Sequence, residues 1–507
     1  MKAKLIIYLC TFSFFLSAQK YDYVWQLGYR YRPNINFELN FNSKKAVIKT
    51  NTRNFDLYLT TTTMSNPKTG DMLFATNGCN IYDKSFNIME NGNDINLSLI
   101  ADIVCNRFGN VIVQGALALP SPDDKNDSIF YLFNQSFNRI ILGNQKLIVD
   151  KFYYSIIDIK KNNGLGSVIS KNQILLNDTL DGGIVSVKHA DGKSWWILVR
   201  EYNTTNFYTY KLSSNGIDSP FTQSIGLTYD YPCNGGIQSC FSPDGKKLAA
   251  YSNCDGLFIY DFNRQTGKLS NFMHDTLYEL PGYWHGGCVI SPNSQFLYAL
   301  TGNTIYQYDL KASDIKSSKV LVAQYDGYKD PFDVYLTFGQ LAPDCRIYVF
   351  SINGIQSFGY IKYPDRKGID CQVVQHGISL PKDDLAVAGS VPNFPNYRLG
   401  VTPTYPCDST IEFKVATSEV QLPPVQYILY PNPTNTTLNI DYEPTGGETK
   451  ADVTITDLLG KIVFTQKLDL YSTPLSMDVQ NLPAGMYHCI FKVKDKLPTA
   501  QRFVIIR

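Results

Sequence analysis

Five histidines are the residues in this chain best suited to acid–base catalysis or metal binding, and they are widely separated. No two of them lie within ten residues of each other, and the sequence contains neither an HExxH motif nor a CxxC pair. Zinc sites and metalloproteases use ligands at such short spacings. We therefore expect no metal, no cofactor and no catalytic residue that the sequence can identify. The histidines are His189, His274, His285, His376 and His488.

Other catalytic motifs give no stronger signal. The sequence has no G-x-S-x-G nucleophile elbow and no phosphate-cradling glycine loop. The acidic run at residues 121–128 (SPDDKNDS) suggests calcium, but it lacks the glycine at position six and the final glutamate of a calcium-binding loop. A solvated hairpin tip is the simpler interpretation of this run.

Three polar residues stand directly before glycine pairs and form the best candidate for a ligand-binding face. His285 precedes Gly286-Gly287, while Asp181 and Asn234 take the same place before their own glycine pairs. If these positions begin equivalent strands, the three side chains form a polar ring on one face of the fold. The alternative, which the residue types favour, is that they satisfy local backbone groups in turns.

The N-terminus predicts export. Lys2 and Lys4 precede an almost unbroken apolar run over residues 5–16, and Leu16-Ser17-Ala18 offers a cleavage site before Gln19. This is the pattern of a secretory signal peptide over residues 1–18. No later stretch reaches eighteen uninterrupted apolar residues, so we expect no transmembrane anchor.

Ten cysteines remain after the predicted signal, and an even number in an exported protein permits disulfides. Cys240, Cys288 and Cys489 lie in alternating apolar segments, where buried free thiols are at least as plausible. Cys371 and Cys407 lie outside the strongest strand patterns, and we predict a disulfide between them. Connectivity as a whole does not follow from sequence.

Composition favours a β-rich, multi-unit protein. The chain has 507 residues, which suits two or three units. It contains 35 Tyr and 29 Phe, and aromatic residues are favoured in strands. The net charge of +1 gives no electrostatic footprint for nucleic acid or an anionic membrane.

A repeat supplies the elements that would position the candidate residues. Its clearest copies cover residues 235–248, 286–297 and 338–347, and their turn prolines are 49 and then 51 residues apart, at positions 243, 292 and 343. Each copy predicts four short antiparallel strands, with proline and Asp or Asn forming the first tight turn.

Four strands in about fifty residues are typical of a β-propeller blade. We predict an all-β fold with a propeller over residues 19–400. About 380 mature residues fit seven blades, and six or eight remain compatible. Two successive β-sandwiches are the competing architecture.

A second, smaller unit follows a proline-rich linker. The linker covers residues 401–427 and contains a strand-like run at 410–415. Residues 428–507 alternate apolar and polar side chains in several short runs, which predicts a small Ig-like β-sandwich.

Two resemblances follow from these motifs. The turn at residues 241–248 (FSPDGKKL) resembles the WD40-like PD40 propeller repeat, and residues 260–270, 291–298 and 392–400 are similar to secreted Bacteroidota propellers that end in a sorting domain. The likeness covers residues 180–410 well and the first 180 residues poorly. Cys345 departs from the pattern, because it replaces the usual glycine of the turn.

The terminal module resembles the type A C-terminal sorting domain of type IX secretion. It carries Tyr-Pro-Asn-Pro, Asp-Leu-Leu-Gly-Lys and Leu-Pro-Ala-Gly-Met-Tyr in that order, before a final strand. The resemblance implies delivery to the cell surface or the medium, with the secretion machinery as partner. A fibronectin-like spacer is the alternative. The motif residues are Pro431, Asn432, Pro433, Asp457, Gly460, Pro483 and Gly485.

Two classes of function fit these features. The leading hypothesis is a non-enzymatic binding or scaffold module that recognises a protein or glycan at the cell surface. The alternative is a secreted hydrolase or lyase that acts on carbohydrate or peptide at the mouth of the propeller channel. Two or more carboxylates, or a histidine with carboxylates, converging on the channel would favour the enzyme.

Overall fold

The structure is a computed structural model that divides into two compact units, Met1–Ser418 and Glu419–Arg507. It describes residues 19–507 except 29–34, 44, 99, 107, 125–126, 142–145, 229–236, 278–284, 381–385, 409, 419–424, 443–448, 471–474, 494–495 and 497. The predicted signal peptide, residues 1–18, lies outside the described residues. No helix in the described part of the chain is long and apolar enough to cross a membrane.

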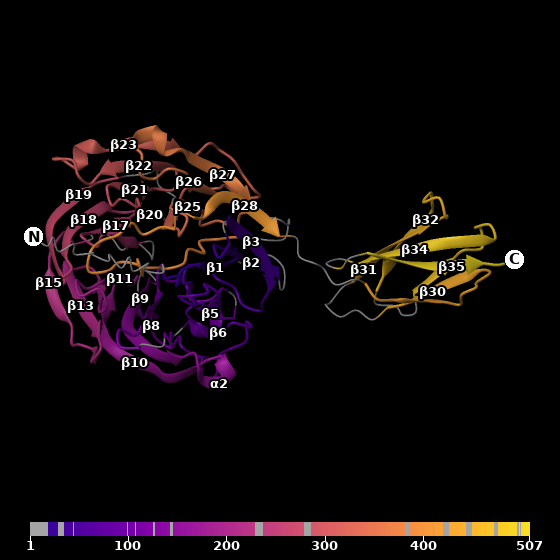
Figure 1. The fold of residues 1–507 in the computed structure, drawn as a ribbon, viewed down its shortest axis with the longest axis horizontal. Coiled ribbons are helices and arrows are strands. Elements are labelled where there is room, and N and C mark those ends of the chain that lie inside the picture. Colours follow the sequence, from indigo (N-terminus) through magenta and orange to yellow (C-terminus); the bar gives the residue numbers. More distant parts are fainter. Residues whose placement is uncertain are drawn as a thin grey trace, which may run out of the picture. The chain divides into compact units, whose positions relative to one another are not determined.

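The first unit is a β-propeller. Its described residues form seven sheets in a ring, which we number as blades 1–7 in chain order (Figure 1). Blade 1 joins three N-terminal strands to one distant strand, and blade 2 has three described strands. These strands are β1 (Val24–Leu27), β2 (Ile35–Asn40), β3 (Lys45–Thr52) and β28 (Glu412–Ser418) in blade 1, and β4 (Thr62–Ser65), β5 (Met72–Thr76) and β6 (Ile81–Asp83) in blade 2.

Blades 3–5 follow in sequence, each running from an inner to an outer strand. Blade 3 contains β7 (Ala116–Pro120), β8 (Ile129–Ile141), β9 (Lys146–Asp158) and β10 (Ser167–Leu180). Blade 4 contains β11 (Val185–Lys188), β12 (Trp195–Arg200) and β13 (Asn206–Ser213), with β14 (Gly216–Ile217) and β15 (Phe221–Ser224) both paired to β13. Blade 5 contains β16 (Gln238–Phe241), β17 (Lys247–Ser252), β18 (Gly256–Asn263) and β19 (Lys268–Asp275).

Blades 6 and 7 complete the ring. Blade 6 contains β20 (Gly287–Ile290), β21 (Phe296–Leu300), β22 (Thr304–Asp309) and β23 (Val320–Gln324). Blade 7 contains β24 (Phe338–Leu341), β25 (Ile347–Phe350), β26 (Ser357–Ile361) and β27 (Val373–Ser379). Single helical turns, α1 (Ala101–Val104), α2 (Lys161–Gly164), η1 (Lys316–Ser318) and η2 (Gly368–Cys371), lie in the connections.

The repeated turn has the same backbone bond in blades 4–7. Its fourth residue donates its N–H to the carbonyl oxygen of the first, as Gly245 does to Ser242 at 2.7 Å. The fourth residue has positive φ, and Gly245 adopts it at 71° without steric cost. The turn thus fixes where each inner strand ends and the second strand begins. The equivalent pairs are Gly192–His189, Ser294–Ser291 and Cys345–Ala342.

Apolar faces of neighbouring sheets form the propeller core. Between blades 4 and 5, Trp196 packs in one buried cluster with Leu248 and Phe258. Corresponding clusters lie between blades 5 and 6 and between blades 6 and 7. Because each sheet is apolar on both faces, a blade is stable only with its neighbours stacked on it.

The ring is closed by a strand from far along the chain. Strand β28 pairs with β3 in parallel, whereas the strand pairs inside the other blades are antiparallel. Part of the predicted linker, residues 401–427, therefore belongs to the propeller. The linker prediction was wrong here because the strand-like run at 410–415 finds its partner more than 350 residues earlier, a pairing invisible to local pattern.

The second unit is a two-sheet sandwich. One sheet contains β29 (Ile428–Tyr430), β30 (Thr437–Asp441) and β33 (Leu475–Asp478), and the other contains β31 (Lys450–Thr456), β32 (Ile462–Asp469), β34 (Gly485–Val493) and β35 (Thr499–Ile505). Inward-facing side chains such as Leu438, Val453 and Phe491 are fully or almost fully buried. This alternation matches the two-residue period seen in the sequence.

The motifs of the second unit lie at turns and strand ends. Asn432, between Pro431 and Pro433, accepts a bond from the Val504 amide at 3.0 Å and donates to the Arg502 carbonyl. Asp457 accepts from the amides of Leu459 and Lys461 in a turn that Gly460 completes with a φ of 81°. Tyr487 donates its hydroxyl to the Pro483 carbonyl at 2.8 Å, just after β34 starts at Gly485. These residues therefore stabilise the sandwich itself.

The cysteines differ from the predicted pairing. Cys79 and Cys105 form a disulfide, and Cys254 is also disulfide-bonded. Cys345, Cys371 and Cys407 are free thiols in the structure, and the predicted bond between Cys371 and Cys407 is wrong because the two cysteines lie in different surroundings. Cys371 is buried in the core between blades 6 and 7, whereas Cys407 lies beside Cys345. Cys240, Cys288 and Cys489 are free thiols, as the alternating pattern indicated.

Candidate functional site

A segment of the chain itself crosses the centre of the propeller. We call residues 391–408 the strap; it connects blade 7 to β28 and appears as the orange trace across the ring in Figure 1. Its first part contacts inner-strand residues of blades 2, 3 and 4, and its last part returns to blade 7. The strap thus occupies the centre of the ring.

Asn393 is the hub of the strap. Its side-chain amide donates to the carbonyl oxygens of Ala116 at 3.0 Å and Ile184 at 2.9 Å, at the starts of β7 and β11. Its side-chain oxygen accepts from Gln114 at 3.2 Å, and its backbone N–H donates to Thr61 at 3.1 Å. One buried asparagine therefore joins three blades.

Farther along, the strap is anchored by an aromatic ring and an ion pair. Tyr397 is fully buried and donates its hydroxyl to the Ala118 carbonyl at 2.8 Å. Arg398 makes two parallel bonds to Asp22, Nη1–Oδ1 at 2.6 Å and Nη2–Oδ2 at 2.9 Å. Burial raises the pKa of Asp22, and the Arg398 guanidinium opposes that shift.

Two glutamines bridge blades that are not neighbours in the ring. Gln114, before blade 3, donates to the Ser239 carbonyl at 2.9 Å and accepts from the Ser239 amide at 2.8 Å. Gln238 of blade 5 makes the same two-way contact with Gly339 of blade 7, at 2.8 Å and 3.3 Å. Each side-chain amide thus satisfies inner-strand backbone groups that adjacent strands leave open.

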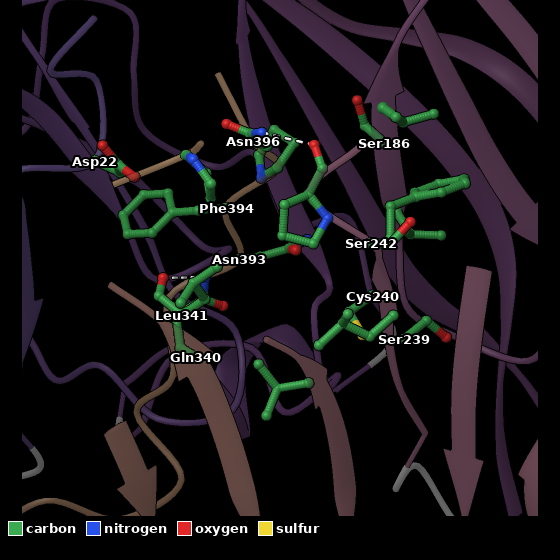
Figure 2. A pocket seen from close by; sticks show the side chains of 18 of the residues that line it. Asp22, Ser186, Ser239, Cys240, Ser242, Gln340, Leu341, Asn393, Phe394 and Asn396 are labelled. Carbon is green, nitrogen blue, oxygen red and sulfur yellow. Dashed lines mark hydrogen bonds between the residues drawn. The ribbon is translucent and has the colours of Figure 1, made fainter. Parts of the chain in front are cut away.

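Beside the strap lies a cavity of about 80 Å³ (Figure 2). Ser186, Ser239 and Gln340 face it from blades 4, 5 and 7, and Asn393, Phe394 and Asn396 face it from the strap. A cavity of this volume holds about five water molecules and is far smaller than ordinary small-molecule sites. Among the described residues that line it, Asp22 and Arg398 are the charged ones, and they are paired with each other.

This lining does not form an acid–base pair. General acid–base hydrolysis needs two titratable groups aimed at one reacting centre. The lining residues in the described part of the chain supply one carboxylate, Asp22, and Arg398 occupies both of its oxygens. The polar groups that these lining residues present are mainly amides and hydroxyls, which can form hydrogen bonds.

Asp181 lies outside this cavity, in a smaller one of about 30 Å³ between blades 4 and 5. Its Oδ2 is 3.5 Å from Nε of Arg200, and both side chains are buried. Burial raises the pKa of Asp181 to about 7, while Arg200 opposes the rise. Tyr260 lines the same space, and burial raises its pKa to about 12.

The other two residues of the predicted ligand face do not join Asp181. His285 precedes β20 and packs edge-on against Phe338, with ring centroids 6.1 Å apart. Burial lowers the pKa of His285 to about 4, so the ring is neutral at physiological pH. His285 lines neither cavity, and Asn234 lies outside the described residues. Within the described ranges, no three His, Cys, Asp or Glu side chains gather as a metal site.

Sequence reasoning missed the strap as the occupant of the channel. Residues 392–400 stood out as a shared pattern, but Asn393 and Arg398 carried no visible role. Their partners lie 277 and 376 residues away in the chain. Polar residues among buried aromatics and prolines were the available signal, because buried polar groups need partners.

Similarity to solved structures is confined to the overall architecture. A functionally unknown protein from Desulfotomaculum acetoxidans is 13% identical over 72% of this chain and 99% of its own, with a TM-score of 0.38. The periplasmic gluconolactonase of Pseudomonas aeruginosa is 11% identical over 72% and 98%, with a TM-score of 0.33. The fucose-recognising six-bladed lectin of Aleuria aurantia is 11% identical over 74% and 98%, with a TM-score of 0.35. The propeller assignment itself comes from the blades described above, and none of these likenesses indicates a chemistry.

Family comparison identifies the second unit. A search of curated proteins finds no significant match to the chain. Residues 428–507 match the family model described as the secretion system C-terminal sorting domain. The match covers the whole sandwich with its three motifs. Residues 428–507 are therefore the C-terminal sorting domain of type IX secretion, and the protein that carries them is exported to the cell surface or secreted.

Proposed function

We propose that the exported propeller is a non-enzymatic binding module that recognises a protein or glycan at the cell surface. The observation that carries this proposal is the strap, which places Asn393 and the paired Arg398 where a channel ligand would bind. Recognition is then a task for an outer surface, with the strap serving to hold the blades together.

The hydrolase or lyase alternative needs carboxylates, or a histidine with carboxylates, converging on the channel. Among the described residues that line the cavity beside the strap, Asp22 supplies the one carboxylate, and it is already paired with Arg398. Histidine–carboxylate contacts do occur in the propeller. His189 Nδ1 lies 3.0 Å from Asp191 Oδ2 in the turn after β11, and neither residue lines the cavity beside the strap. A second contact joins His376 Nε2 to Asp326 Oδ2 at 3.1 Å. The His376–Asp326 contact lies at the outer strand β27 of blade 7 and not at the channel, which supports a surface role.

An exposed aromatic loop beside this contact is the best candidate surface. We call Tyr325, Asp326, Tyr328, Phe332 and His376 the rim patch. Tyr328 stacks on His376 with ring centroids 4.0 Å apart and remains exposed, and Phe332 is 53% exposed. Exposed aromatic side chains next to hydrogen-bonding groups are favoured at recognition sites.

The loop is held rigid by its own contacts. The Tyr325 hydroxyl bonds to Asp333 at 2.8 Å and to the Tyr328 carbonyl at 2.7 Å. Lys329 pairs with Asp333 at 3.2 Å, and the backbone N–H of Val334 donates to the Tyr328 carbonyl. A preorganised aromatic surface loses little conformational entropy when it binds.

Glycan and peptide arrays probed with the purified mature chain test the proposal. We expect a ligand whose affinity falls at least tenfold in Phe332→Ser and Tyr328→Ser. Ile369→Ser is the matched control, because Ile369 is 75% exposed outside the patch. Binding that is equal in all variants would exclude the rim patch, and release of cleaved products from an array ligand would favour the enzyme.

A further inference from the structure

Cys345 occupies a turn position that suits glycine. The equivalent residue is Gly245 in blade 5, with a φ of 71°, and Cys345 adopts a φ of 68° at the same point in blade 7. A side chain in this left-handed region costs folding free energy that glycine avoids. A cysteine here therefore calls for a compensating interaction of its side chain.

The side chain of Cys345 meets the returning end of the strap. Cys407 lies against it, and burial together with this contact raises the pKa of the Cys407 thiol. The strap is fixed on both sides of Cys407: Asp408 N–H donates to the Pro343 carbonyl at 2.7 Å, and the Tyr405 hydroxyl bonds to Asp365 at 2.7 Å. Two cysteines from distant parts of the chain are thus held together by contacts of the residues around them.

We propose that Cys345 and Cys407 become joined by a disulfide in the exported protein and thereby fasten the strap to blade 7. Export takes the chain into a compartment where disulfides form, and Cys79–Cys105 and Cys254 are already oxidised in the structure. Cys345 and Cys407 are both partly exposed, so a reagent can reach them. Cys407 is thus still expected to form a disulfide, but with Cys345 and not with Cys371.

The oxidant is a disulfide of a thiol–disulfide oxidoreductase, acting by exchange. One cysteine thiolate attacks the donor disulfide and forms a mixed disulfide, and the second thiolate then displaces the donor. The Cys345–Cys407 bond forms as the donor disulfide is reduced to a dithiol. Two electrons pass to the donor, and the two protons lost by the protein thiols are taken up by the donor thiolates.

A second close pair of thiols provides an internal control. Cys240 and Cys288 lie on the neighbouring inner strands β16 and β20, with sulfur atoms 3.9 Å apart. Cys288 is fully buried and donates its S–H to the Gln238 carbonyl at 3.3 Å. A donor disulfide could reach only the partly exposed Cys240, and because Cys288 is buried with its S–H bonded to a carbonyl, we expect it not to act as the second thiolate and this pair to remain as thiols.

The proposed bond would secure the closure of the ring. Strand β28 begins five residues after Cys407 and supplies the outer strand of blade 1. A bond to blade 7 at Cys407 therefore fixes the last segment of the propeller before its closing strand.

Peptide mapping of the full exported chain tests the proposal directly. The protein is denatured without reductant, its free thiols are alkylated, and the digest is analysed by mass spectrometry. We expect a peptide pair linked through Cys345 and Cys407, with Cys371 and Cys288 alkylated. If Cys79–Cys105 is recovered intact while Cys345 and Cys407 are both alkylated, the proposal is wrong, and a Cys371–Cys407 link would also overturn it.

Two variants separate the disulfide from ordinary packing. In the oxidised protein, Cys407→Ser and Cys345→Gly should each lower the Tm of the propeller by about 2–6 °C. Under reducing conditions, Cys345→Gly should equal or exceed the unmodified chain, because glycine suits the positive φ. A Cys345→Gly variant that is more stable than the unmodified chain in the oxidised protein would contradict the proposal.

Discussion

Arg398 and Asp22 form a buried, two-pronged ion pair that joins the strap to the first described residues of the propeller, 376 positions earlier in the chain. Arg398 also donates to the carbonyl oxygens of Gln19 and Pro406. The pair therefore connects the N-terminal end of the ring, the outgoing strap and its return. A buried arginine fork of this kind specifies geometry as well as charge balance.

Removing the cation should strongly destabilise the propeller. Arg398→Met leaves the buried Asp22 carboxylate unpaired, and we expect a loss of about 3–5 kcal/mol in the free energy of unfolding. All four tryptophans lie in the propeller sequence, so tryptophan fluorescence during urea unfolding of the full chain reports on this unit. Lys329→Met is the matched control, because its ion pair with Asp333 is exposed and should contribute less than about 1 kcal/mol. Equal effects of the two substitutions would mean that the strap ion pair has no special structural role.

The hub asparagine should matter more than its neighbour in the strap. Asn393→Ala removes the side-chain donor to the Ala116 and Ile184 carbonyls and one of the two acceptors of the Gln114 amide, and we expect a loss of about 2–4 kcal/mol. Asn396 makes two side-chain bonds, donating to the Pro243 carbonyl at 2.8 Å and accepting from the Arg398 amide at 3.1 Å, and it is only partly buried, so Asn396→Ala should cost about 1–2 kcal/mol. Urea midpoints of the two variants give the comparison, and a larger loss for Asn396→Ala would contradict the hub assignment.

The buried carboxyl of blade 4 predicts a pH dependence with a definite sign. Because the pKa of Asp181 rises from 3.8 to about 7 on folding, the folded state binds the proton more tightly than the unfolded state. The stability that Asp181 contributes is therefore complete below about pH 4 and is lost as the pH rises towards 7.

Asp181→Asn removes this titration. The stability of the variant relative to the unmodified chain should increase between pH 5 and pH 8. The increase should be of the order of 1 kcal/mol for each pH unit up to about pH 7, where folded Asp181 titrates. Urea unfolding at both pH values measures the difference. If the stability of Asp181→Asn relative to the unmodified chain falls as the pH rises, folding stabilises the Asp181 carboxylate and lowers its pKa, which would contradict the prediction.

Much of the propeller was predictable because its information is local and repeated. The turn that ends with Gly245 recurs with Ser294 and Cys345, and each copy sets a hairpin through short-range bonds. Blade 1 could not be completed in this way. Its outer strand β28 pairs with β3 across almost the whole unit, and no local period records that pairing.

The candidate site was less predictable for the same reason. The predicted ligand face assumed that His285 and Asp181 point to a common space, but His285 packs against Phe338 whereas Asp181 lines the small cavity between blades 4 and 5. In the channel, Asn393, Gln114 and Gln238 make hydrogen bonds to residues far away in the sequence. Their partners include backbone carbonyls and amides. Backbone partners leave no residue-type signature, so sequence alone does not reveal them.

Ending the chain at residue 427 should leave the propeller intact, whereas ending it before residue 412 should not. Deleting residues 428–507 removes the second sandwich but keeps β28, which completes blade 1. We expect this truncated propeller to fold, with an unchanged urea midpoint, and to accumulate in the periplasm because its sorting domain is gone. Fractionation of cells and medium, followed by immunoblotting, measures its location.

A deletion that starts at residue 412 is the matched comparison. It removes β28 as well, leaving the edge of β3 unpaired and the ring open. This shorter chain should unfold at a lower urea concentration than the chain that ends at residue 427, although both lack the sorting domain. Appearance of the 427-residue chain in the medium would contradict the role of residues 428–507 in export, whereas equal stability of the two chains would contradict the role of β28 in closing the propeller.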